Sequence, residues 1–167
     1  MIKIASLLFL LIATACQNPS LTKTYGLNGI GVQNYIADGN KDEIYYNYEY
    51  KAKPVYYSFR PIAGFTVNKD LDAYVYGGGE MDFALPYDFY ISPSFAGGYY
   101  RVEDGEDLGG KTIFRSGGSL KYKLKSDNVI SIGAYNLSNF GLDDKNPGAD
   151  IVQINYEVAV PPFTKYF

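Results

Sequence analysis

The chain has 167 residues, a length typical of a single domain. Its formal net charge of −3 is too small to indicate a nucleic-acid partner, and its single cysteine excludes an internal disulfide. Tyrosine and glycine, at 18 residues each, are unusually common, and tryptophan is absent. This composition is typical of a β-protein whose sheet closes on itself.

The first 15 residues have the pattern of an export signal. Lys3 supplies a positive charge, an apolar core follows from Ile4 to Ile12, and small residues at Ala13 and Ala15 suit cleavage. The apolar core is shorter than the ~20 residues that a membrane-spanning helix needs. Cys16 follows directly, so we expect either a lipidated cysteine or, after ordinary cleavage, a free thiol. Residues 16–167 are then predicted to form one barrel domain.

Eight strand-like runs follow, and most of them alternate apolar and polar residues. Clusters of Gly, Pro, Asn and Asp separate the runs and predict turns, whereas no helical period of useful length occurs. The first run is Gly-rich and alternates poorly, which leaves its register open. The predicted strands cover residues 25–37, 43–51, 55–66, 73–85, 89–102, 112–124, 130–138 and 150–160.

Two all-β architectures are compatible with this alternation. A soluble sandwich or lipocalin-like barrel would turn the apolar face inward, whereas an outer-membrane barrel would turn it toward lipid. Several runs reach the 9–11 residues that a tilted strand needs to cross a bilayer. Charged residues also recur on the face opposite the apolar one, where opposite signs can pair inside a small barrel. We therefore predict an eight-stranded antiparallel up-and-down outer-membrane β-barrel; these charged residues are Arg60, Glu80, Asp82, Arg115, Lys121 and Glu157.

Polar residues continue the apolar face of the last two predicted strands. Alternation places Asn136 and Ser138 in line with Ile130 and Ile132, and it places Asp150 in line with Val152. A polar group without a partner in apolar surroundings costs roughly 2–7 kcal/mol. A hydroxyl, an amide and a carboxylate could satisfy one another there.

This stretch resembles the lipid A 3-O-deacylase family, outer-membrane barrel enzymes also called acyloxyacyl hydrolases. That family has a His-x-Ser-Asn motif at the end of its penultimate strand, which Ser138 and Asn139 match. An Asn-Pro-Gly loop follows at residues 146–148, and Asp150 stands where the family has an acidic residue. Asn136 occupies the histidine position, and the sequence contains no histidine. Residues 91–100 and 108–117 resemble the family's fifth and sixth strands.

The resemblance implies ester hydrolysis of a lipid A acyl chain in the outer membrane of a Gram-negative cell. Ser138 would be the nucleophile, Asp150 the orienting acid, and Asn139 with the amides around Gly141 and Asn146 would support the oxyanion. Asn136 can hold this geometry by hydrogen bonds, but a carboxamide accepts no proton near neutral pH. No cofactor and no metal are expected, and the pair Asp143-Asp144 is interpreted as a solvated loop.

Three functions remain compatible with the sequence. The first is a lipid A 3-O-deacylase-like barrel whose activity is reduced or lost without the base. The second is a non-catalytic barrel that binds lipid A or stabilises the envelope, with Asn136, Ser138 and Asp150 merely contacting headgroups and water. The third is a soluble lipocalin-like binder tethered through Cys16. The oligomeric state is open, a homodimer included.

Overall fold

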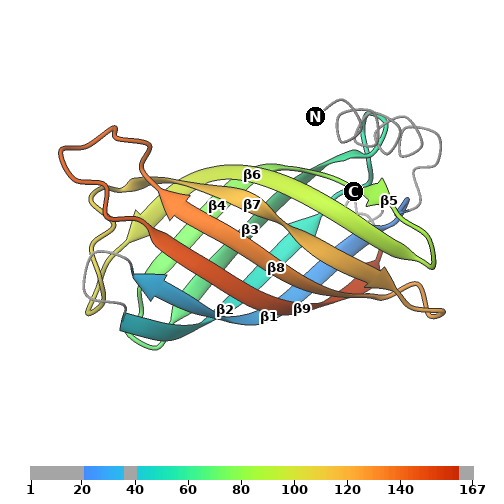
Figure 1. The fold of residues 1–167 in the computed structure, drawn as a ribbon, viewed down its shortest axis with the longest axis horizontal. Coiled ribbons are helices and arrows are strands. Elements are labelled where there is room, and N and C mark those ends of the chain that lie inside the picture. The colour runs from blue at the N-terminus through green and yellow to red at the C-terminus, as the bar shows by residue number, and fades with distance from the viewer. Residues whose placement is uncertain (1–20, 36–40, 162–167) are drawn as a thin grey trace, which may run out of the picture.

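The computed structural model describes residues 21–35 and 41–161, and in this part of the chain nine strands form one closed antiparallel sheet (Figure 1). Sequence neighbours pair with one another except β4 and β5, which both pair with β6, and β1 pairs with β9 to close the barrel. The predicted signal segment and Cys16 lie outside the described residues. The strands are β1 (Thr24–Tyr35), β2 (Lys41–Lys51), β3 (Phe59–Asn68), β4 (Ala73–Met81), β5 (Phe83–Ala84), β6 (Phe89–Arg101), β7 (Thr112–Lys123), β8 (Val129–Ser138) and β9 (Ala149–Val160).

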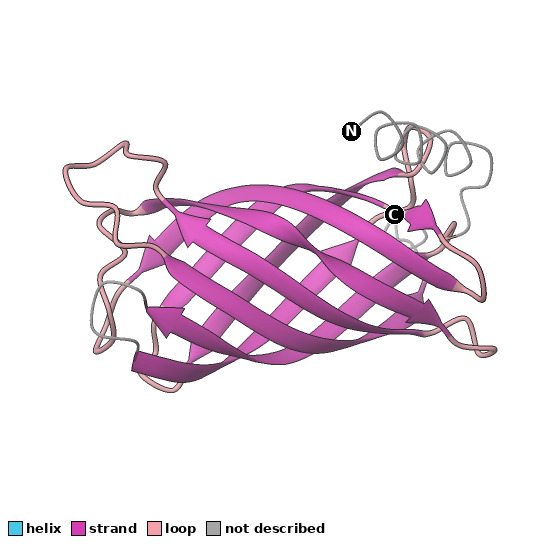
Figure 2. Ribbon diagram, in the orientation of Figure 1, coloured by secondary structure: helices cyan, strands magenta, loops and turns pink. Residues whose placement is uncertain are grey.

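The nine strands make eight staves, because β5 continues the line of β4 after a break at Asp82. Both β4 and β5 pair with β6, so the predicted fourth strand is confirmed as one stave in two pieces. The fold is therefore the predicted closed, eight-stranded, all-β antiparallel barrel (Figure 2). Among the described residues, no helix is long and apolar enough to cross a membrane.

The third strand begins later than the alternation predicted. Residues 55–58 fold back as a tight turn, in which the N–H of Phe59 donates to the carbonyl of Tyr56 at 2.8 Å. Tyr57 adopts a φ of 48°, outside the strand region. The β-propensity of three consecutive apolar and aromatic residues concealed this turn in the sequence.

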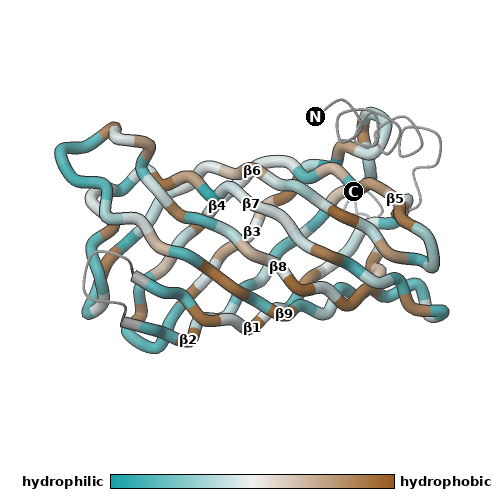
Figure 3. Tube along the Cα trace, viewed as in Figure 1, coloured by the Kyte–Doolittle hydropathy of each residue, from teal (hydrophilic) through white to brown (hydrophobic). Residues whose placement is uncertain are grey.

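The two faces of the sheet differ in polarity as an outer-membrane barrel requires. Apolar side chains of every long strand are exposed on the outer wall, among them Ile44, Val75, Ile132 and Ile154. Figure 3 shows hydrophobic and hydrophilic residues interspersed along the strands of the near wall. The inward residues include charged ones that are almost fully buried. A soluble barrel would reverse this arrangement, so the lipocalin-like alternative does not describe this fold.

The buried charges pair with one another in the lumen. The ammonium of Lys51 lies 2.9 Å from Glu157 and 3.0 Å from Glu80, which also contacts Lys121. Four cationic and four acidic side chains take part in these ion pairs. The other pairs are Lys121–Asp82 at 2.8 Å, Arg60–Asp82 at 2.9 Å and Arg115–Glu49 at 2.7 Å.

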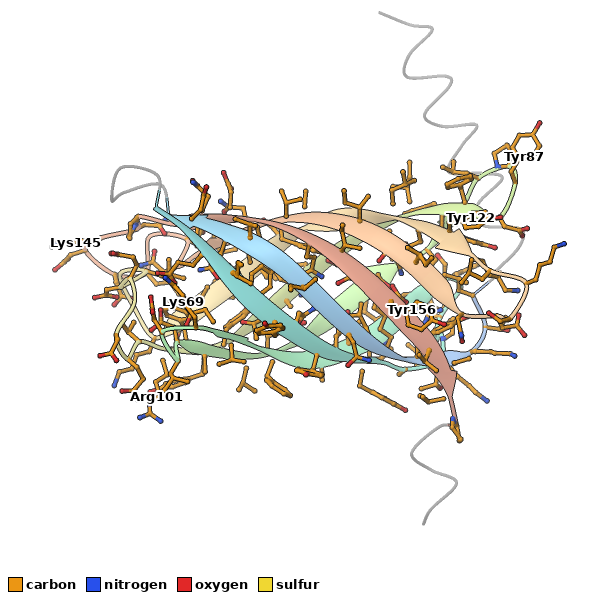
Figure 4. The ribbon with its side chains drawn as sticks, turned by 90° about the horizontal axis from the view of Figure 1, so that it is seen from below. Lys69, Tyr87, Arg101, Tyr122, Lys145 and Tyr156 are labelled. Atoms are coloured by element: carbon orange, nitrogen blue, oxygen red, sulfur yellow. The ribbon has the colours of Figure 1, made fainter. Side chains whose placement is uncertain are left out.

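The two ends of the barrel differ. At one end, here called the turn end, β1 begins, β9 ends, and residues 52–58, 85–88 and 124–128 connect the strands. At the other, the loop end, lie the two longest described connections, residues 102–111 and 139–148. Figure 4 shows Lys69, Arg101 and Lys145 at the loop end and Tyr87 at the turn end. The candidate site lies at the loop end.

Candidate active site on the outer wall

Asn136 and Asp150 face each other across neighbouring strands near the loop end. They are direct partners in the ladder of β8 and β9, and Ser138 is the last residue of β8. All three belong to the outward set, in line with the exposed Ile132 and Val152. The structure thus brings together the three residues that the sequence predicted, on the outside of the barrel.

One hydrogen bond joins the amide to the carboxylate. Nδ2 of Asn136 donates to Oδ1 of Asp150 at 2.9 Å and lies 3.5 Å from the carbonyl oxygen of Ala149. The Ser138 hydroxyl oxygen instead accepts from the backbone N–H of Phe140 at 3.1 Å. Among the described residues, no hydrogen bond links Ser138 to Asn136 or Asp150. Position 136 nevertheless lies between the other two, since it is opposite Asp150 and two residues from Ser138 on the same face.

Asn139 fixes the loop that follows the serine. Its side chain is fully buried and donates to the carbonyls of Gly109 at 3.2 Å and Lys145 at 2.6 Å. Its Oδ1 accepts from the N–H of Gly141 at 2.8 Å, and its own N–H donates to Oδ1 of Asn146 at 3.0 Å. Asn139 therefore ties the β8–β9 loop together and joins it to the β6–β7 loop.

The predicted oxyanion role of Gly141 and Asn146 stays a prediction. The hydrogen bonds to Asn139 occupy the N–H of Gly141 and the side-chain oxygen of Asn146. Phe140 and Gly141 both have positive φ, 53° and 73°, so the chain turns sharply directly after Ser138. The N–H of Phe140 donates to the Ser138 hydroxyl oxygen, so within the described residues it too already has an acceptor.

Three phenylalanines border the serine on the outer wall. Phe114 is the ladder partner of Ser138, and its ring lies 5.0 Å from that of Phe140. The ring of Phe95 lies 5.9 Å from Phe114 and 6.0 Å from Phe140. Sequence reasoning missed this cluster because it depends on the register of three strands and a loop, which no local pattern reveals.

The chemistry available here is that of a hydroxyl beside an amide–carboxylate pair. A serine nucleophile needs a group that takes its proton as it attacks, and an amide cannot do this. The 167-residue sequence offers no imidazole at any position. Within the described part of the chain, no cluster of three or more Cys, Asp or Glu side chains that could hold a metal ion occurs.

Comparisons with known proteins bear on the family and the fold. Residues 43–159 match the family model described as lipid A 3-O-deacylase (PagL). The fold is similar to the crystal structure of the outer membrane enzyme PagL, with a TM-score of 0.63, 15% identity, and coverage of 81% of this chain and 99% of that one.

Two other solved barrels are less similar. A de novo designed transmembrane β-barrel has a TM-score of 0.49 at 14% identity and covers 82% of this chain and 96% of its own. The Yersinia pestis outer membrane protein Ail has 0.47 at 15%, with 81% and 99%. No curated protein matches the sequence. Because the family model spans most of the chain, the protein belongs to the lipid A 3-O-deacylase (PagL) family.

Proposed function

We propose that the protein is an outer-membrane barrel that binds lipid A and hydrolyses its 3-O-linked acyl ester slowly, with Ser138 as the nucleophile. The observation that carries the proposal is the outward position of Ser138, Asn136 and Asp150, where the apolar wall ends near the loop end. A site in this place meets a lipid within the bilayer without extracting it. Family membership supplies the substrate class.

The orientation of the barrel supports the same substrate. Outer-membrane barrels have short periplasmic turns and longer extracellular loops. The loop end, with residues 102–111 and 139–148, is then extracellular, so Ser138 lies in the outer leaflet, where lipid A resides. The phenylalanine cluster beside Ser138 offers apolar surface to the acyl chain.

The reaction proceeds through an acyl-enzyme. The Ser138 oxygen attacks the ester carbonyl carbon, the bond to the sugar oxygen breaks, and that oxygen leaves as a hydroxyl after taking up a proton. Water then hydrolyses the serine ester and releases the fatty acid. Asn136 cannot receive the serine proton, so water or the second oxygen of Asp150 takes it, less effectively. Loss of a triad member costs several powers of ten in rate but leaves residual catalysis.

Mass analysis of lipid A tests the proposal. Cells that express the protein are expected to accumulate, over hours, a small fraction of lipid A lacking one acyl chain, and Ser138→Ala is expected to abolish it. Deacylation that persists in Ser138→Ala would contradict the nucleophile.

A second function, lipid A binding without turnover, is favoured by one observation. The bond between Asn136 and Asp150 satisfies both groups without involving Ser138. Lipid A that co-purifies with the wild type, without any deacylated product even on prolonged incubation, would select this alternative.

A further inference from the structure

A row of four polar side chains crosses the outer wall near the loop end, beginning at Asn136 and extending over three further strands. Asp150 is the ladder partner of Asn136 on one side and of Asn34 on the other, and Asn34 is in turn the partner of Asp42. The row therefore runs across β8, β9, β1 and β2, which lie side by side (Figure 1). We call these four residues the polar rung. At ~4.8 Å per strand, its three steps span about 14 Å.

The polar rung borders the apolar wall directly. One step toward the turn end, the ladder partners are Ala134, Val152, Val32 and Ile44, all outward and all apolar. Val152 and Ile44 are each 54% exposed, as lipid-facing side chains would be. A ligand that contacts the polar rung while its chains lie on this wall must have a polar head and apolar tails.

The hydrogen bonds within the rung leave two of its acceptor oxygens without a donor among the described residues. Asn136 donates to Asp150 at 2.9 Å, and Nδ2 of Asn34 donates to Oδ1 of Asp42 at 2.8 Å. No hydrogen bond joins Asn34 to Asp150, although they are direct partners within the described residues. The Asn34 side-chain oxygen and Oδ2 of Asp150 are thus two acceptors on neighbouring strands with no donor between them.

The charge of the rung selects the ligand chemistry. Carboxylate and amide oxygens accept hydrogen bonds from hydroxyl and amide N–H groups. Two carboxylates disfavour direct contact with a phosphate, so the rung suits a part of a sugar headgroup that carries no phosphate. Side chains of this kind, held on rigid strands, suit the O–H and N–H groups of a glucosamine ring. The length of the rung allows contact with more than one sugar ring.

We propose that the polar rung is the binding site for the glucosamine backbone of lipid A, and that Asn34 and Asp42 on β1 and β2 extend it beyond the reaction centre. This inference rests on the proposed function. It assigns substrate binding to two strands that carry none of the residues predicted for the chemistry. Asn34 and Asp42 bind the sugar through its hydroxyl and amide hydrogens and leave the ester to Ser138.

The test measures lipid A binding to the full chain in detergent, by native mass spectrometry, with Ser138→Ala in every arm so that no substrate is consumed. Asn34→Leu combined with Asp42→Leu is expected to lower the affinity for lipid A about tenfold and to leave phosphatidylglycerol binding unchanged. Asn28→Leu is the matched control, because Asn28 lies on the same outward face of β1, nearer the turn end. It is expected to bind lipid A as the Ser138→Ala protein does.

Each result bears on the inference. Competition by the acyl-free glucosamine disaccharide supports sugar recognition, and so does intermediate binding by Asp42→Asn. Equal lipid A affinity in the double variant and in the Asn28→Leu control overturns the rung while the proposed function stands. Parallel loss of phosphatidylglycerol overturns sugar specificity, and binding lost in EDTA but restored by Mg²⁺ overturns direct contact. Absence of lipid A binding in the Ser138→Ala protein overturns both proposals.

Discussion

At the scale of single residues, Asn136 limits the rate of the proposed reaction. It lies opposite Asp150 and on the same face as Ser138, which is the position that a base must occupy to bridge the two. Positions 136 and 138, two apart on one strand, are separated by about 6.6–7 Å. A histidine ring at position 136 could span part of this distance. The Asn136 amide donates a hydrogen bond to Asp150, but it cannot take the serine proton in the proposed reaction.

Replacing Asn136 by histidine is therefore expected to raise the rate of lipid A deacylation. An imidazole bonded to Asp150 through one nitrogen directs the other toward Ser138, and general-base catalysis typically contributes about 10²–10⁴-fold. The base must be neutral, so the rate of the variant should rise with pH through about 6.5 and then level off. Quantifying the released fatty acid at several pH values measures both effects.

The control for this experiment is Asn136→Gln, which keeps an amide and offers no base. It should show no gain in rate. If Asn136→His also gave none while remaining folded, the failure would lie elsewhere in the site, in the oxyanion donors or in the position of Ser138.

At the scale of elements, two loops position the serine together. Asn139 of the β8–β9 loop donates to the carbonyl of Gly109 in the β6–β7 loop, and it holds Gly141 and Asn146 within its own loop. The β6–β7 loop is itself anchored by the buried Asp72, which accepts from the N–H of Glu103 at 2.8 Å. The place of Ser138 thus depends on contacts that reach across the loop end of the barrel.

Gly109→Ala tests this dependence. Gly109 has a φ of 83°, and a Cβ there would overlap the backbone carbonyl of Lys145, so the two loops must separate. We expect faster hydrogen exchange throughout residues 139–148 and at least tenfold lower deacylation in the Asn136→His background. Hydrogen–deuterium exchange by mass spectrometry measures the first effect.

Gly141→Ala is the matched control, since Gly141 also has a positive φ but a Cβ there would meet nothing within 4 Å. It should cost only about 1–2 kcal/mol of backbone strain and leave the β6–β7 loop unchanged. Equal effects of the two substitutions would mean that strain alone, without any contact between the loops, governs the serine.

The positions of the strands could be predicted from the sequence far better than the contacts between neighbouring strands. Alternation along each strand fixes which residues face outward, so Ser138 and Asp150 could be placed on one face without a structure. Asn34 could not be connected to them, because its strand is Gly-rich and the register of β1 with β9 follows only from barrel closure. The early turn at Tyr57 escaped notice for a related reason: aromatic residues favour strands, but the chain had to reverse there.

At the scale of the whole molecule, the barrel has an apolar outer wall and a lumen that contains buried ion pairs. Figure 4 shows side chains projecting outward along the length of the wall, with Tyr122 and Tyr156 among them. Inside, each cation has at least one acidic partner within 3.0 Å. A buried charge without a partner is strongly unfavourable, so the stability of the barrel depends on this pairing.

Removing one charge from the lumen is expected to destabilise the barrel, and removing its partner as well should restore part of the loss. Lys51 pairs with both Glu157 and Glu80, so Lys51→Met removes a cation from each of these carboxylates. Breaking a buried pair costs about 3–5 kcal/mol. Lys51→Met with Glu157→Gln removes both charges of one ion pair, so the double variant should lose less than the sum of the two single losses. Urea-induced unfolding of the barrel in lipid vesicles, followed by the tyrosine signal, measures these free energies.

Lys23→Met serves as the control because its ion pair with Asp127 is at the surface, so the unfolding midpoint should not move. If the losses in unfolding free energy of the two single variants simply add in the double variant, Lys51 and Glu157 contribute independently. Their ion pair would then not stabilise the fold.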